Sequence, residues 1–265
     1  MNDHLPKGVS ALERFGLEGR TALITGATRG LGLAMARGFA SVGADVVVSS
    51  RKAEACEQTA ESLRSDFGVQ AWALPCNVSS WDQCTTLALE AERITGGVDV
   101  LVNNAGLSPL YPSLGEITES LYDKVIGINA KGPFRLAALI GEAMLARGHG
   151  SIINVTSIES DNPSTQAVPY AAAKAALATT TLGLSRAFGP RVRVNTISPG
   201  PFLTDISKAW DMDQFSAAAQ RAIALGRGGL PDEIVGAALY LASDASSYTT
   251  GATIKVDGGV HGALG

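Results

Sequence analysis

Short apolar runs rich in β-branched residues alternate along the chain with longer stretches in which apolar positions recur at helical spacing. Several of the short runs are almost continuously apolar, which is typical of strands buried on both faces of a parallel sheet. They predict strands over residues 21–25, 45–50, 69–74, 98–102, 151–155, 192–197 and 253–256. The stretches between them predict helices over residues 30–42, 52–66, 80–94, 118–146, 167–188 and 231–242.

Strands that alternate with helices of this size are repeated βαβ units. The pattern therefore predicts an α/β fold with a doubly wound parallel sheet of about seven strands and helices on both faces. We expect one domain over residues 16–265, preceded by a loose N-terminal arm over residues 1–15. The segment 203–226 breaks the rhythm, and we interpret it as two short helices that cover the carboxyl edge of the sheet as a substrate lid.

Composition narrows the class of protein. Of the 265 residues 46% are hydrophobic and 17% are charged, which is enough apolar matter for a large core. The net charge of −4 leaves no basic stripe for nucleic acid, and charged residues interrupt every long apolar run, so we expect neither nucleic-acid binding nor a membrane span. The three cysteines and three histidines lack the spacing of a disulfide framework or a metal site. Without an apolar segment in residues 1–10 we expect no signal peptide and a cytoplasmic protein.

A glycine-rich loop follows the first predicted strand and opens the first helix, with the sequence Thr25-Gly-Ala-Thr-Arg-Gly-Leu-Gly32. Gly26 permits a tight turn, Gly30 lets the backbone approach a pyrophosphate, and Gly32 lets the helix pack closely on the sheet. The N–H groups and the dipole at the helix N-terminus attract phosphate. A glycine-rich turn without a ligand is the alternative, and the strand-before, helix-after context disfavours it.

The end of the second strand favours one dinucleotide over another. A site for NAD usually carries Asp or Glu here, against the ribose 2′-hydroxyl. This chain has Ser50 and Arg51 instead, and Arg29 of the glycine loop lies on the same side. These residues would attract a 2′-phosphate, which favours NADP(H) over NAD(H). The alternative is that Arg51 is a solvated residue at the start of the next helix.

Tyr170 and Lys174 stand one helical turn apart, and Ser157 ends a strand 13 residues before the tyrosine. Reduction of a carbonyl by hydride needs a proton donor, and a phenol with a pKa of ~10 needs a nearby cation to act at neutral pH. We expect Lys174 and an oxidised nicotinamide to lower the pKa of Tyr170, and Ser157 to donate a hydrogen bond to the substrate oxygen. A nucleophilic role for Ser157 is weaker, because no Gly-x-Ser-x-Gly surrounds it.

Together these motifs resemble the short-chain dehydrogenase/reductase family over almost the whole chain. The resemblance rests on Thr25-Gly-x-x-x-Gly-x-Gly32, Asn103-Asn-Ala-Gly106, Asn129, Ser157, Tyr170-x-x-x-Lys174 and Pro199-Gly200. It implies a Rossmann fold, a nicotinamide cofactor and Tyr170 as acid/base, with Lys174 on the nicotinamide ribose and Asn129 holding a water for proton relay. The cofactor-binding residues it implies are Gly26, Thr28, Arg29, Gly30, Leu31, Ser50, Arg51, Asn77, Val78, Asn104, Ala105, Gly106, Tyr170, Lys174, Pro199, Gly200 and Thr204. For Asn103 a purely structural role at the strand end is an equal alternative.

Two positions qualify the resemblance. The family usually has Asp-Val after the third strand, and this chain has Asn77-Val78. An asparagine can still accept a hydrogen bond from the adenine amino group through its amide oxygen. Tyr170 and Lys174 have three residues between them, whereas the family's enoyl-reductase branch has six, so double-bond reduction is disfavoured.

We therefore expect hydride transfer between NADP(H) and a ketone, an aldehyde or a secondary alcohol, without a metal. Ser157, Glu159 and Phe202 are candidate substrate contacts, although Glu159 could equally face solvent. The resemblance implies a homotetramer assembled through two helices. A catalytically silent nucleotide sensor or scaffold on the same fold is the alternative, and the intact Ser157, Tyr170 and Lys174 set argues against it; the complete glycine loop argues against a hydrolase or dehalogenase.

Overall fold

A seven-stranded, entirely parallel sheet organises the molecule, in the order β3-β2-β1-β4-β5-β6-β7. The computed structural model describes residues 10–204 and 211–260. The strands are β1 (Thr21–Thr25), β2 (Asp45–Ser49), β3 (Ala71–Ala73), β4 (Val100–Asn103), β5 (Gly150–Val155), β6 (Val192–Pro199) and β7 (Thr253–Val256). The doubly wound α/β prediction is confirmed, because strand order reverses between β1 and β4.

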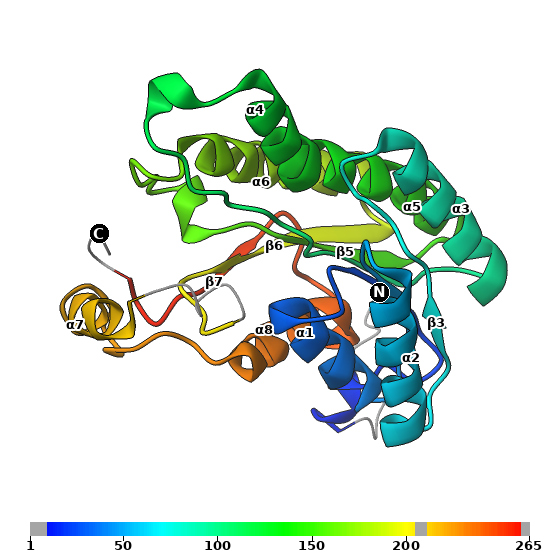
Figure 1. Cartoon of the computed structure of the whole chain (residues 1–265). Helices are drawn as coiled ribbons and strands as arrows, with labels where there is room; N and C mark the ends of the chain where they lie inside the picture. Colours follow the sequence, from blue (N-terminus) through cyan, green and yellow to red (C-terminus); the bar gives the residue numbers. More distant parts are fainter. Residues whose placement is uncertain (1–9, 205–210, 261–265) are drawn as a thin grey trace.

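Helices cover both faces of this sheet (Figure 1). One face carries α1 (Gly30–Ala40), α2 (Ala53–Phe67) and α8 (Val235–Ala242), and the other carries α3 (Trp81–Thr95), α4 (Glu119–Ile126), α5 (Gly132–Arg147) and α6 (Val168–Phe188). The described residues also contain short helical turns between these elements or before the first of them. They are η1 (Glu13–Phe15), η2 (Leu114–Glu116), η3 (Gly127–Lys131), η4 (Ile158–Ser160), η6 (Pro231–Ile234) and η7 (Asp244–Ser246).

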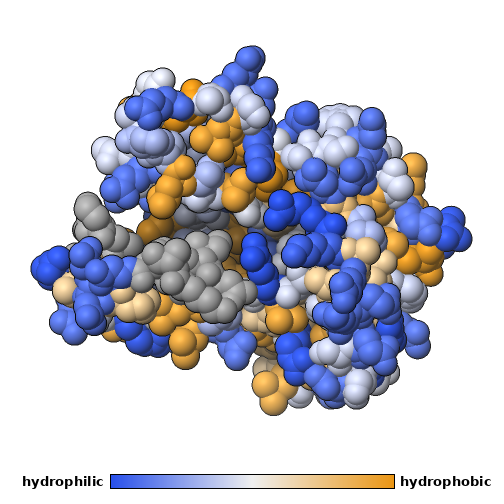
Figure 2. Space-filling view, viewed as in Figure 1, coloured by the Kyte–Doolittle hydropathy of each residue, from blue (hydrophilic) through white to orange (hydrophobic). Residues whose placement is uncertain are grey.

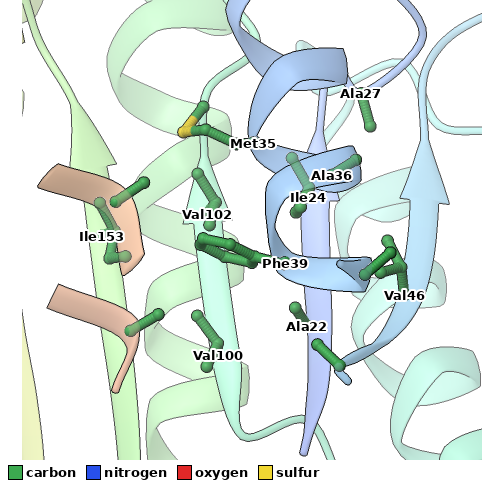
Figure 3. Close-up of a cluster of buried hydrophobic side chains, with 14 of the residues drawn as sticks. Ala22, Ile24, Ala27, Met35, Ala36, Phe39, Val46, Val100, Val102 and Ile153 are labelled. Carbon is green, nitrogen blue, oxygen red and sulfur yellow. The ribbon is translucent and has the colours of Figure 1, made fainter. Parts of the chain in front are cut away.

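Alternate residues of the buried strands supply two separate cores. Ala22 and Ile24 of β1 belong to the cluster beneath α1, whereas Leu23 belongs to the cluster beneath α3 and α5. Figure 3 shows Phe39 of α1 lying over the sheet beside Val102. Its side chain is fully buried, so it holds the helix that begins at the glycine loop against the sheet.

The long helix predicted over residues 118–146 is present and contains a π-helical turn that the sequence did not predict. It consists of α4, the π-helical turn η3 and α5, which follow one another without a break. Gly132 approaches the carbonyl of Val78 so closely that a Cβ there would lie 1.9 Å from the oxygen, and Pro133 supplies no N–H. Such a turn inside a helix re-aims the side chains on it, here Asn129.

Two further predictions fall partly outside the described residues. Of the segment 203–226, the structure describes 203–204 and 211–226, and the second part forms the helix α7 (Met212–Ala222). Residues 205–210, and residues 1–9 of the expected arm, lie outside the described part. In residues 10–204 and 211–260, no helix combines the length and the apolar character that crossing a bilayer requires.

Candidate active site

A cavity of about 380 Å³ opens where the strands end, at the reversal of strand order. In Figure 2 the surface is hollowed left of centre, with hydrophobic side chains gathered above the hollow. Every residue predicted to bind the cofactor lines this cavity, and so do Ser157 and Phe202. The cavity therefore brings together the glycine loop and the Ser157, Tyr170 and Lys174 set.

The glycine loop fits so closely against its surroundings that Gly26 and Gly32 have no room for a side chain. A Cβ on Gly32 would lie 2.2 Å from the carbonyl oxygen of Gly26, and Gly26 itself has a φ of +67°. The Asn104 amide donates to the carbonyl of Thr25 at 2.9 Å, and the Thr25 hydroxyl accepts from the backbone N–H of Asn104 at 3.0 Å. These bonds attach the loop after β1 to the loop after β4, so that both stay at the same wall of the cavity.

The wall at the end of β2 is polar and positively charged. Thr28 donates a hydrogen bond to the Ser50 hydroxyl at 3.2 Å. The Ser49 hydroxyl is buried, and no hydrogen-bond partner satisfies it within the described residues. Arg29 and Arg51 are exposed at the cavity's rim, and neither forms an ion pair in the described part of the chain. A buried hydroxyl without a partner beside two available guanidinium groups suits an anionic, hydroxyl-rich ligand.

Lys174 and Tyr170 lie side by side at the opposite end. The Lys174 ammonium is 2% exposed, donates to the Val155 carbonyl at 2.7 Å and stands 5.7 Å from the centre of the Tyr170 ring. Ser157 lies near enough to the Tyr170 hydroxyl to lower the pKa of that group. The structure thus places a phenol, an aliphatic hydroxyl and an amino group within one small region.

The pKa of Tyr170 in the protein alone is raised. Desolvation by the surrounding protein raises it to about 12, although the interaction with Ser157 lowers it, and Glu159 adds a smaller upward effect. Burial also lowers the pKa of Lys174 to about 7, so that near neutrality this group is only partly a cation. The expected lowering of the tyrosine pKa included the charge of an oxidised nicotinamide, and it stays a prediction.

Comparison with known proteins agrees with this geometry. Residues 26–261 match the family model described as enoyl-(acyl carrier protein) reductase. The chain is 35% identical to human dehydrogenase/reductase SDR family member 4, over 94% of this chain and 90% of the relative. It is 40% identical to sorbose reductase of Candida albicans, over 96% and 91%. A solved gluconate 5-dehydrogenase from Burkholderia cenocepacia, in complex with NADP and tartrate, has a TM-score of 0.89 at 37% identity, covering 94% of this chain and 98% of that one.

This chain is a short-chain dehydrogenase/reductase. The relatives above are named as a reductase and a dehydrogenase, which supports an oxidoreductase that acts on alcohols or ketones. The residues present fit the nicotinamide dinucleotide that such enzymes use: the glycine loop lines the cavity where α1 begins, and Arg29 and Arg51 line it without an ion-pair partner in the described part of the chain.

Within this short-chain dehydrogenase/reductase, Asn129 is buried behind the cavity wall. Its amide N–H groups donate to the carbonyls of Leu107 at 2.8 Å and Val125 at 2.9 Å, and its oxygen accepts from the Leu107 N–H at 3.1 Å. The side chain thus holds the loop that follows β4. The water relay expected at Asn129 stays a prediction.

Other predicted residues take roles that motifs alone did not distinguish. Asn103 is fully buried and donates to Pro133 and to Asn154, which favours its structural alternative. The Asn77 amide oxygen accepts both from the N–H and from the hydroxyl of Ser79. It therefore lacks the free acceptor that we expected to face adenine, and its amide N–H group remains as a donor.

The predicted substrate contacts divide between two places. Phe202 lines the cavity, whereas the carboxylate of Glu159 lies outside the lining and accepts from the N–H of Ser164 at 2.7 Å. Lining residues that we did not expect from the sequence are Ser49, Cys76, Ile128, Val155, Thr156 and Pro201. Most of these adjoin a predicted residue at a strand end, which is the signal that would have found them. Among the described residues, no group of three metal-binding side chains exists.

Proposed function

We propose that this protein is an NADP(H)-preferring reductase of ketones or aldehydes, and equally a dehydrogenase of the corresponding secondary alcohols. The observation that carries the proposal is the shared cavity. Arg29 and Arg51 stand at the end where a 2′-phosphate would bind, and Tyr170 stands with Ser157 at the other. A single extended ligand can reach both ends.

The proposed reaction divides the work between cofactor and protein. The dinucleotide supplies or accepts the hydride when it is bound. In the reductive direction Ser157 donates a hydrogen bond to the carbonyl oxygen, and Tyr170 gives its hydroxyl proton to that oxygen as negative charge develops there. In the oxidative direction Tyr170 takes the proton back. Asn129 contributes by holding the substrate-side loop at Leu107.

The protonation states support reduction at neutral pH. A Tyr170 pKa of about 12 keeps the phenol protonated at neutral pH, and the positive charge of the bound cofactor and of Lys174 would favour release of its proton. A Lys174 pKa of about 7 lets that group gain a proton as Tyr170 gives one up, because a phenolate beside it would favour the ammonium. Charge near the phenol is thereby compensated within the pair.

Preference for NADP(H) rests on the polar wall at the end of β2. A 2′-phosphate there would meet Arg29 and Arg51 from the two sides, with Ser50 as a hydrogen-bond donor. Within that wall no carboxylate lines the cavity. The relative bound to NADP agrees with this assignment.

The remaining expectations belong to the same proposal. We propose a homotetramer that acts on a small molecule in the cytoplasm, with residues 16–265 as one dinucleotide-binding and catalytic domain. The three cysteines are free, which fits a reducing compartment. The expected lid overlaps residues 205–210, outside the described part of the chain.

Absorbance at 340 nm tests the proposal directly. We expect NADPH to be consumed with a ketone panel that includes sorbose, and NADP to be reduced with gluconate or other secondary alcohols in at least one case. Tyr170→Phe should lower kcat by roughly 10²–10⁴-fold while NADPH binding, followed by fluorescence, persists. NADPH binding without turnover across the panel would favour the silent sensor, and faster turnover with NADH would remove the cofactor preference.

A further inference from the structure

Tyr111 connects the loop after β4 to the start of the helix that carries Tyr170. Its hydroxyl accepts from the backbone N–H of Val168 at 3.0 Å and donates to the carbonyl of Thr165 at 3.1 Å. The two bonds span 57 and 54 positions of sequence, so they are tertiary contacts. They use both the donor and an acceptor of one hydroxyl group.

The first turn of α6 needs such a partner, because it lacks a cap of its own. Ala167 stands at the N-cap position and has no side chain that could accept a hydrogen bond. Pro169 follows Val168 and carries no N–H. The backbone N–H groups of Val168 and Tyr170 therefore have no acceptor within the helix itself. A helix N-terminus with an alanine at the cap is ordinarily weaker than one with Ser, Thr, Asp or Asn.

Tyr170 is placed two residues beyond the capped N–H, in the same helical turn. Tyr111 and Tyr170 also line one small hollow, together with Pro109 and Pro169. A change at the first turn of α6 would therefore move the phenol that faces Ser157. Proton transfer is sensitive to such movement, because the reacting atoms must be within hydrogen-bond reach.

The same loop reaches the cavity from its other end. Leu107 and Ser108 line the cavity, and the main chain of Leu107 is fixed on both sides by Asn129. Asn129 and Tyr111 thus hold the loop at two points, one against the π-helical turn and one against α6. The loop and the tyrosine are positioned as one unit.

We infer that Tyr111 is a positioning residue. Its hydroxyl is remote from α6 in sequence, but it accepts a hydrogen bond from the first N–H of that helix and thereby fixes Tyr170 against Ser157. This inference rests on the proposed function, in which Tyr170 transfers the proton. Tyr111 touches neither the cavity nor the reacting atoms. Its effect is exerted through the helix.

Tyr111→Phe tests the inference, because it removes the hydroxyl and keeps the ring. Tyr122→Phe is the matched control, since Tyr122 lines the same hollow but its hydroxyl has no hydrogen-bond partner among the described residues. For the ketone that the wild-type enzyme reduces fastest, we expect Tyr111→Phe to lower kcat by about 3- to 10-fold, the effect of one lost hydrogen bond. We expect the dissociation constant for NADPH to stay at the wild-type value and the solvent deuterium isotope effect on kcat to rise. Tyr122→Phe should match the wild type in all three.

Each other outcome has a definite meaning. If Tyr111→Phe and Tyr122→Phe have the same kcat, the distant cap does not position Tyr170 and the inference is wrong. A parallel loss of NADPH binding would show general damage to the fold, which also overturns it. A Tyr170→Phe variant measured beside them separates the two levels: if it keeps wild-type activity, the acid/base assignment fails and the inference fails with it, whereas an inactive Tyr170→Phe with a normal Tyr111→Phe refutes the inference alone.

Discussion

Replacing Arg51 by glutamine should change the choice of cofactor more than the catalytic rate. Arg51 lies on the cavity wall after β2, and its side chain is exposed and forms no ion pair in the described part of the chain. Its charge is therefore available to a phosphate, and removing it leaves the neighbouring Arg29 as the remaining guanidinium at that wall. NADH has no 2′-phosphate and so lacks the group that Arg51 would attract.

The exposure of the Arg51 side chain to solvent determines how strongly its loss should weaken the use of NADPH. Two unit charges about 4 Å apart attract by about 1 kcal/mol in bulk water and about 4 kcal/mol near a protein surface. Since Arg51 is exposed, we take the lower part of this range, about 1–2 kcal/mol, which corresponds to a factor of about 5–30. The kcat/KM for NADPH should fall by this factor, and the value for NADH should stay unchanged.

The assay is kcat/KM for both cofactors at low and high ionic strength, measured with one ketone. Lys52→Gln is the control, because it removes an equal charge from the adjacent residue, which does not line the cavity. The NADPH advantage of the wild type should shrink in 1 M salt, where the screening length is about 3 Å. The reasoning is refuted if Arg51→Gln keeps the wild-type ratio between the cofactors, or if Lys52→Gln alters that ratio as strongly.

Three shorter predictions address the remaining walls of the site. Gly32→Ala should weaken NADPH binding and lower the melting temperature, because its Cβ would collide with the Gly26 carbonyl; fluorescence titration and thermal unfolding measure both. Asn104→Ala should lower the free energy of unfolding by about 1–3 kcal/mol, since the Thr25 carbonyl loses its donor, and urea unfolding measures this. Because burial lowers the Lys174 pKa from 10.5 to about 7, the unfolded chain binds more protons between these values, so the free energy of unfolding should rise with pH across that window by at most about 5 kcal/mol. Urea titrations at several pH values should show that Lys174→Met lacks this rise, and an equal rise in that variant would contradict the assignment.

Local patterns predicted the first strand and the glycine loop after it. β1 begins and ends at the predicted residues, and the glycine loop lines the cavity. The other residues predicted to bind the cofactor came from the family resemblance, and they line the same cavity. The strand and the glycine loop depend on neighbours in sequence: an apolar run makes a buried strand, and glycines at fixed spacing make a turn that a helix can follow. Each of these features is determined by about ten consecutive residues.

Features that depend on distant contacts were predicted less well. The π-helical turn at residues 127–131 lies beside the close approach of Gly132 to Val78, a contact that no local pattern reveals. The Asn77 oxygen is engaged by Ser79, and the Tyr170 pKa rises because of the protein packed around it. In each case the tertiary surroundings determine what a recognised residue can do.

The π-helical turn connects a residue recognised from a local motif with contacts that are distant in sequence. It points the Asn129 amide at Leu107, and a Cβ on Gly106, the preceding residue, would lie 3.1 Å from the Asn129 oxygen and 3.6 Å from the Lys174 ammonium. Gly106 thus lets the loop after β4 lie between the buried amide and the buried cation. A Cβ there would be in ordinary contact with Lys174 but would press on the Asn129 oxygen, which cannot move without disturbing its hydrogen bonds to Leu107 and Val125. The glycine that ends the Asn-Asn-Ala-Gly motif therefore fits the close approach of this loop to Asn129.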